Sequence, residues 1–257
     1  MKKVILLLVA LSAAACATTP DVIDPYEKTN RKIFEFNRKV DRVILDPVAN
    51  TYNAVMPSPA RKGIRNAFDN LSEPMTFAND ILQAKPERAI STLARFIINS
   101  TVGIAGLWNP AEKMGLKRHK EDIGQTLAVW GFKESPYFII PFVGPSTTRD
   151  TVGFTASLFL DPTDYVIDKE FGWEWVYARL GADIITIRAE LDKVLDDLYS
   201  ETDPYLLARS AYLQRRDYLI RDGREKEYDE EDDLFFDDEL DDEEVELLNL
   251  ILSSKNQ

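Results

Sequence analysis

The amino-acid sequence predicts an all-α fold, and three observations support this prediction. Apolar residues recur at helical spacing over long stretches. Alternating apolar and polar residues, which are typical of strands, are scarce. The 13 prolines and 11 glycines separate the helical stretches and form no internal repeat.

The first two predicted helices lie in the N-terminal half. Over residues 24–46 the apolar positions are spaced at three or four residues, as on one face of a helix. A second helix begins at Pro86, because proline suits the first position of a helix. It places Ile90, Leu93 and Ile97 on one face.

Two further helices are predicted in the C-terminal half. Residues 173–198 carry the longest helical pattern of the chain, with apolar steps of three or four throughout. Asp203 and Pro204 then form a typical N-cap and first-turn pair, which opens a helix that runs to about Ile220. Phe138, Ile139 and Ile140 form an apolar run that is too short to anchor a sheet.

Length and composition predict one globular domain, or two small ones, and we assign a single helical domain to residues 24–224. A chain of 257 residues with 45% hydrophobic and 11% aromatic content can bury enough surface to fold. The net charge of −13 argues against nucleic acid as a partner, because such binding needs a basic surface.

The N-terminus has the pattern of a secretory signal. Lys2 and Lys3 precede an apolar segment at residues 4–11, which is too short to span a bilayer. Small residues follow at 12–15, and Cys16, the only cysteine, comes directly after them. This is the position of the acylated cysteine in bacterial lipoproteins.

We therefore predict a signal peptide at residues 1–15 and a lipidated linker at residues 16–23, with Cys16 acylated. The alternative is an ordinary signal peptide followed by a chance cysteine. In bacterial lipoproteins an aspartate after the cysteine causes retention at the inner membrane. Ala17 occupies that position here, which favours the periplasmic face of the outer membrane.

The acidity of the chain is concentrated near its C-terminus. Residues 229–246 contain 13 acidic and no basic side chains, and removing them would bring the net charge to zero. Such a block repels itself, so residues 225–257 are predicted to be a disordered, solvated tail. The apolar residues at 245–252 leave a short helix or an interaction motif as the alternative.

The sequence offers little for catalysis. The only histidine, His119, lies in a charged segment at residues 117–122 and is predicted to be solvated. No nucleophile elbow, P-loop or dinucleotide fingerprint is present. We therefore predict no enzyme activity, no catalytic residue, no metal and no cofactor. A lipid hydrolase is the enzymatic rival, and it would release fatty acid.

Three stretches are unusually apolar for a soluble helical protein: residues 93–108, 137–143 and 152–160. Either they form buried core, or they form surface that touches lipid tails within one leaflet without crossing it. Composition favours neither alternative, because buried and lipid-facing helices have similar sequences.

Several sequence blocks resemble the MlaA (VacJ) family of outer-membrane lipoproteins over about residues 24–223. The most telling block reads PYFIIPFVGPS at residues 136–146 and is followed by Arg149 and Asp150. Its order and spacing relative to the other blocks make the resemblance specific. The other blocks lie at residues 24–37, 46–48, 59–66, 70–79, 95–103, 121–131 and 203–216.

The resemblance implies a disc-like helical protein that encloses an amphipathic channel for phospholipids misplaced in the outer leaflet. It also implies trimeric porins, a periplasmic lipid carrier and an inner-membrane transporter with an ATPase as partners, and maintenance of lipid asymmetry as the task. The alternative function is that of a structural envelope lipoprotein, which binds porins without moving lipid.

Candidate residues follow from the apolar stretches and from polar residues at helical spacing. The hairpin-like segment 138–142 is predicted to touch lipid and to border the passage, and Arg149 with Asp150 is predicted to be a local ion pair or cap. Candidates for lipid contact are Phe96, Ile97, Ile98, Phe138, Ile139, Ile140 and Phe142. Candidates for the polar lining are Arg31, Asn37, Arg95 and Asn99, and candidates for shaping the loop are Pro136, Pro141, Gly144 and Pro145.

Overall fold

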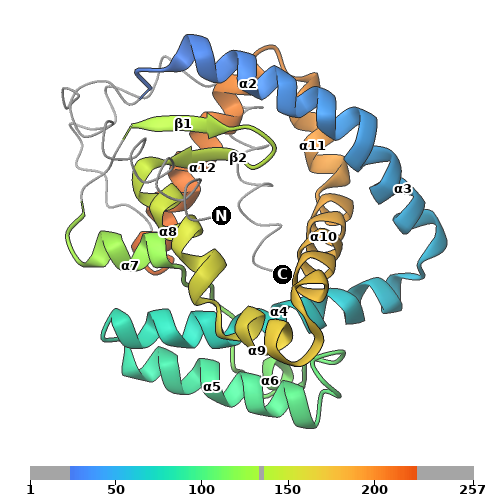
Figure 1. The fold of residues 1–257 in the computed structure, drawn as a ribbon, viewed down its shortest axis with the longest axis vertical. Helices are drawn as coiled ribbons and strands as arrows, with labels where there is room; N and C mark the ends of the chain where they lie inside the picture. The colour runs from blue at the N-terminus through green and yellow to red at the C-terminus, as the bar shows by residue number, and fades with distance from the viewer. Residues whose placement is uncertain (1–23, 133–135, 225–257) are drawn as a thin grey trace.

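A computed structural model describes residues 24–132 and 136–224, and its elements form a ring (Figure 1). Each element packs against the next around this ring, from α2 through the hairpin, α12, α7, α8, α9, α10 and α3 back to α2. The helices are α2 (Glu27–Val40), the π-helix η2 (Asp41–Leu45), α3 (Asp46–Val55), α4 (Ser58–Leu82), α5 (Pro86–Thr101), α6 (Pro110–Lys113), α7 (Ile123–Val129), α8 (Thr148–Leu160), α9 (Pro162–Phe171), α10 (Trp173–Glu190), α11 (Asp192–Ser200) and α12 (Pro204–Ile220). The strands are β1 (Tyr137–Ile140) and β2 (Gly144–Thr147). This confirms the prediction of an all-α fold.

The first predicted helix is longer than expected, because α2, η2 and α3 follow one another without a break. In a π-helix, residues five apart lie near the same face, whereas in an α-helix they diverge. The π-turn therefore brings Asp41 and Asp46 to one side. Both accept hydrogen bonds from Arg188, at 2.8 and 2.9 Å, and Asp192 accepts a third at 2.7 Å. Arg188 thus joins this arc to α10 and α11.

Helix α4 is not among the helices predicted from apolar spacing, although it is the longest in the described part of the chain. It contains Pro74, and its buried residues are polar, so an apolar stripe does not mark its inner face. Helix α5 begins at Pro86 as predicted, and it packs along α4 as an antiparallel pair (Figure 1).

The predicted helix over residues 173–198 is two helices, because the chain bends at Leu191 between α10 and α11. The apolar spacing continues across the bend, so periodicity alone could not reveal it. Helix α12 is confirmed: the Asp203 carboxylate accepts a hydrogen bond from the Leu206 amide at 3.1 Å, and Pro204 occupies the first turn.

The apolar run at residues 138–140 does form a strand, which pairs with β2 as an antiparallel hairpin. Gly144 has φ +108°, which suits glycine, and Phe142 in the turn has φ +66°. Pro145 lies opposite Ile139 in the register, and Pro136 and Pro141 flank β1. The sheet is too small to alter the fold class.

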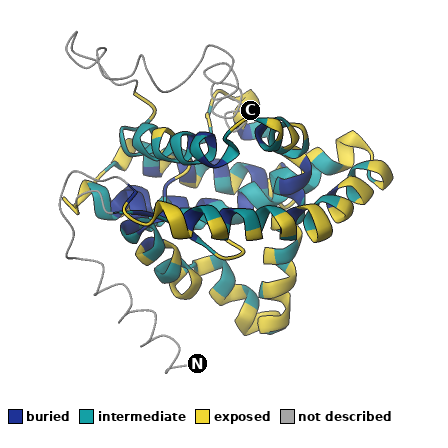
Figure 2. Ribbon diagram, turned by 90° about the horizontal axis from the view of Figure 1, so that it is seen from above, coloured by how far each residue is buried: buried dark blue, intermediate teal, exposed yellow. Residues whose placement is uncertain are grey.

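Two small hydrophobic clusters form the apolar core of the described residues. One contains Leu198, Leu207 and Ala211. The other contains Phe34, Tyr137, Ile139 and Tyr205, so it joins α2, β1 and α12. Figure 2 shows that the buried residues lie in the middle of the molecule and the exposed residues toward its outer edges.

The predictions for the signal peptide, the lipidated Cys16, the linker and the acidic tail concern residues 1–23 and 225–257, which lie outside the described residues.

Candidate functional site

The polarity of the described residues is inverted relative to an ordinary soluble protein. Buried polar or charged side chains number 20, whereas buried hydrophobic ones number 11. Large hydrophobic side chains at the surface number 34 in the same ranges. Single exposed apolar residues are normal, but contiguous apolar surface marks an interaction site. The candidate site is therefore this apolar exterior together with the polar interior it surrounds.

The polar interior is best developed between α4 and α5, in a set of side chains that we call the polar seam. Three contacts cross it: Thr92 donates to Asp80 at 2.7 Å, Arg95 to Glu73 at 3.0 Å, and Asn70 to Ser100 at 2.9 Å. The buried members of the seam are Asn70, Glu73, Thr76, Asn79, Asp80, Thr92, Arg95 and Asn99. The outward sides of the same helices carry the apolar residues.

Arg95 and Asn99, two candidates for the polar lining, are used within the seam. Arg95 is 1% exposed, and burial raises the pKa of its partner Glu73 although Arg95 and Arg118 oppose that shift. The Asn99 side chain donates to the Asn109 side chain at 3.1 Å and accepts from the Ala111 amide at 3.2 Å. Both therefore hold helices together, and we do not propose them as lining residues.

Asn37, another candidate for the polar lining, forms hydrogen bonds to the hairpin. Its side chain donates to the Ile140 carbonyl at 3.0 Å and accepts from the Phe142 amide at 2.8 Å. Two helical turns earlier, Asn30 accepts from the Ile139 amide at 3.0 Å. The two asparagines on α2 thus bond to β1 as a neighbouring strand would.

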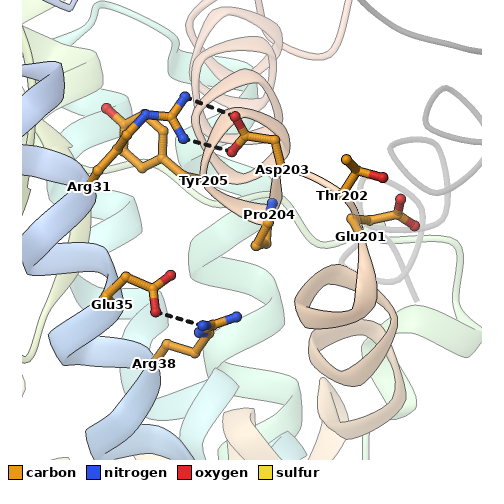
Figure 3. Close-up of a pocket in the computed structure, with 8 residues that line it drawn as sticks. All are labelled: Arg31, Glu35, Arg38, Glu201, Thr202, Asp203, Pro204 and Tyr205. Atoms are coloured by element: carbon orange, nitrogen blue, oxygen red, sulfur yellow. Dashed lines mark hydrogen bonds and ion pairs between the residues drawn. The ribbon is translucent and has the colours of Figure 1, made fainter.

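Arg31 lies at a polar pocket of about 430 Å³ between α2 and the start of α12 (Figure 3). Its guanidinium bonds to both carboxylate oxygens of Asp203, at 2.9 and 2.8 Å, and to Glu27 at 2.7 Å. It also lies 4.5 Å from the ring centre of Tyr205. The hydrogen bond from Arg31 holds the pKa of Asp203 below its usual range. The other basic residue of the pocket, Arg38, is paired with Glu35 at 2.6 Å, so both of its arginines are neutralised by carboxylates of the same pocket (Figure 3).

The candidates for lipid contact differ in how far their side chains are exposed. Phe142 is 72% exposed at the hairpin tip, where it packs edge-on against Phe36 at 5.1 Å, and Ile97 is 52% exposed on α5. Phe96, Ile98, Phe138 and Ile140 are half-buried. Ile139 is 3% exposed within a hydrophobic cluster, so it belongs to the core and we do not retain it.

A long series of exposed apolar side chains comes from residues 154–184, which we call the apolar arm. It comprises most of α8, all of α9 and the first part of α10, and it contains no buried residue. Phe159, Tyr165, Phe171, Trp173 and Trp175 are each at least 60% exposed. Sequence reasoning found only its start, at residues 152–160. The pair Trp173 and Trp175 was an available signal, because residues two apart on a helix cannot both face one core.

The prediction that His119 is solvated is wrong, because its side chain contacts a buried carboxylate. Its Nε2 lies 3.0 Å from both oxygens of Asp80, which has no exposed surface. Glu121 lies near enough to complete a possible ligand set for a cation. However, Lys85 and Arg88 lie 3.4 and 3.3 Å from the Glu121 carboxylate and already balance its charge.

Arg149 and Asp150 form the predicted local ion pair at 3.5 Å. Asp150 also bonds to Arg216 at 2.7 Å and to the Tyr212 hydroxyl at 2.5 Å, so it joins α8 to α12. No helix among the described residues is long and apolar enough to cross a bilayer.

The fold is a ring of helices whose buried residues are mostly polar and whose surface carries many large apolar side chains (Figure 1). This combination is typical of helical proteins that work in apolar surroundings. Residues 22–219 match the family described as MlaA lipoprotein, and the chain belongs to that family.

Named relatives and a solved structure agree with this assignment. The chain is 32% identical over 207 residues to the intermembrane phospholipid transport system lipoprotein MlaA of Escherichia coli (strain K12), covering 79% of this chain and 80% of that protein. The protein of the same name from Haemophilus influenzae is 28% identical over 85% of this chain and 90% of its own length. An uncharacterized protein of Rickettsia typhi is 32% identical over 78% and 79%.

A solved structure described as "Structural basis for maintenance of bacterial outer membrane lipid asymmetry" is also similar to this chain. It has 34% sequence identity and a TM-score of 0.66, and the match covers 77% of this chain and 98% of that one.

Proposed function

We propose that this protein is an outer-membrane lipoprotein that removes phospholipids from the outer leaflet and passes them toward a periplasmic carrier, which maintains lipid asymmetry. Membership of the MlaA lipoprotein family supports this, as do the named function of its relatives and the subject of the similar structure. The single observation that carries the proposal is the inverted polarity, since a ring immersed in one leaflet needs an apolar exterior.

The task also has a physical rationale. A phospholipid with about 30 tail methylenes would expose on the order of 20 kcal/mol of apolar surface if it entered water bare. A carrier lowers this barrier by covering the tails while it offers the headgroup a polar path. We propose that the apolar arm and the tip of the hairpin face the hydrocarbon and that polar groups facing the centre of the ring accompany the headgroup.

No group in the described residues supplies energy for directed transport by itself, so we propose that the direction comes from partners. A periplasmic lipid carrier would accept the phospholipid, and an inner-membrane transporter would drive its return. Trimeric porins are the proposed outer-membrane partner. The acylated Cys16 would keep the ring at the periplasmic face.

The test is complementation of a deletion strain, with surface phosphatidylethanolamine measured by a membrane-impermeant amine reagent. We expect the wild-type chain to remove the surface phospholipid and the Phe142→Asp, Val143→Asp variant to leave it there. Lys39→Asp, at an exposed site on α2, is the matched control and should complement fully. A deletion strain with no surface phospholipid would instead favour the structural, porin-binding alternative, and fatty acid released by the purified protein would favour a hydrolase.

A further inference from the structure

A second cavity lies between the paired helices α4 and α5 and Pro162, at the start of α9. It has a volume of about 510 Å³. Its apolar walls include Pro74, Phe77, Ala78, Ile81, Leu93 and Phe96. We call this cavity the α4–α5 groove. It is separate from the polar pocket at Arg31, with which it shares no residue.

The groove exists because both helices turn their polar faces inward. Glu73 is one of the lining residues, but its carboxylate bonds to Arg95 at 3.0 Å, within the polar seam. Asn79 and Asp80 are likewise buried on the inner side of α4. The wall that remains is therefore almost wholly hydrocarbon.

This wall restricts what can occupy the groove. A peptide segment would bring amide groups into a site with no free hydrogen-bonding partner, and each unpaired buried amide is costly. A polar headgroup is excluded for the same reason. A flexible hydrocarbon chain has no such requirement, and the volume lies within the range of small-molecule binding sites.

The surroundings of the groove indicate the source of that chain. Ile81 is 54% exposed and Leu93 41% exposed, so the groove opens onto apolar surface. That surface continues along α5 to Ile90 and Ile97, which are exposed on the same side. A chain that enters the groove from a surrounding leaflet would thus stay in contact with hydrocarbon along its path.

We propose that the α4–α5 groove binds one acyl chain of a phospholipid from the leaflet around the ring, at a site separate from the passage through its centre. This inference rests on the proposed membrane placement. A bound chain would fix the depth of α4 and α5 in the leaflet and would fill a cavity that otherwise lowers the packing of the helix pair.

The experiment uses the full acylated protein in vesicles of phosphatidylethanolamine and phosphatidylglycerol (3:1) that contain a phospholipid with a photoreactive diazirine on one acyl chain. After irradiation, the labelled residues are mapped by mass spectrometry. We expect label on Phe77 and Phe96 in addition to label on the apolar arm. Ala78→Trp, which fills the groove, should lower the label at Phe77 and Phe96 at least fivefold and leave the label on the arm unchanged.

Two controls keep the result decisive. Ala54→Trp, at an exposed position on α3, should leave the groove label unchanged. Ala78→Leu serves as a smaller filler if the tryptophan variant fails to fold, and we expect it to lower the groove label at least twofold. Label on the arm without label in the groove, or groove label that neither filler lowers, would overturn the acyl site alone. Label nowhere on the chain would overturn the proposed membrane placement as well.

Discussion

Two regions of the ring reach stability by opposite means. Around α2, β1 and α12, apolar side chains such as Phe34 and Leu207 are buried. Between α4 and α5, the buried groups are mostly ionic, amide and hydroxyl side chains, and large apolar groups such as Ile81 and Ile97 are exposed. The first region would be stable in water, whereas the second gains most from apolar surroundings. If the ring lies in a membrane as proposed, the second region is the part that depends on it, whereas the first folds as an ordinary core.

The largest expected effect comes from breaking the polar seam. Arg95→Met would leave Glu73 buried without its nearest cation, and the side chains of both residues are 2% exposed. We expect a loss of about 3–5 kcal/mol in the free energy of unfolding, measured by denaturant titration in detergent. The double variant Arg95→Met, Glu73→Gln should recover much of that loss. If the single variant costs no more than the double, the pair does not stabilise the seam as described.

The second prediction tests the hydrophobic region. Leu207 is 1% exposed, so Leu207→Ala should cost about 3 kcal/mol through lost burial and a residual cavity. Ile97→Ala is the matched control, because Ile97 is 52% exposed and should cost less than about 0.5 kcal/mol in detergent. Equal losses in the two variants would remove the contrast between the regions.

A third prediction concerns the hairpin, which belongs to the first region and is bonded to α2. Asn37→Ala removes both of its hydrogen bonds to the hairpin and should speed hydrogen exchange at the Phe142 amide. We expect a local loss of about 1–2 kcal/mol. Asn50→Ala, at an exposed site on α3, should leave that amide unchanged. Unchanged exchange in Asn37→Ala would show that the turn is held by other contacts.

The smallest effect is the pH dependence of the Arg31–Asp203 pair. The pKa of Asp203 is lowered in the folded state, so its contribution is present above the unfolded value of about 3.9 and is lost as pH falls below it. Because both side chains are more than one third exposed, the contribution is about 1 kcal/mol at most. Comparing thermal melts of wild type and Asp203→Asn at pH 7 and pH 3 measures it. A difference that grows at pH 3 would contradict the assigned sign.

Sequence patterns predicted the elements whose signals are local. Pro86 and Asp203 mark the starts of α5 and α12 because capping and first-turn chemistry involve only neighbouring residues. The apolar run at residues 138–140 between prolines also marks the hairpin, although its pairing with β2 depends on the fold.

The polar seam could not be predicted in this way. A polar helix face suggests solvent, and only the folded chain shows that Glu73 and Arg95 meet across two helices. The contact of His119 could not be predicted for the same reason, since its partner Asp80 is 39 residues away in the sequence. Periodicity identifies the residues that share a face, but it does not tell whether that face meets core, water or lipid.

The pairing of Asn30 and Asn37 with β1 has a consequence for self-association. A two-stranded hairpin leaves open edges that invite a strand from another molecule. The amide of Ile139 in β1 and the amide of Phe142 in the turn that follows already donate to the two asparagine side chains. A helix thereby closes the edge where a third strand would otherwise add, which disfavours β-mediated association between copies of the chain.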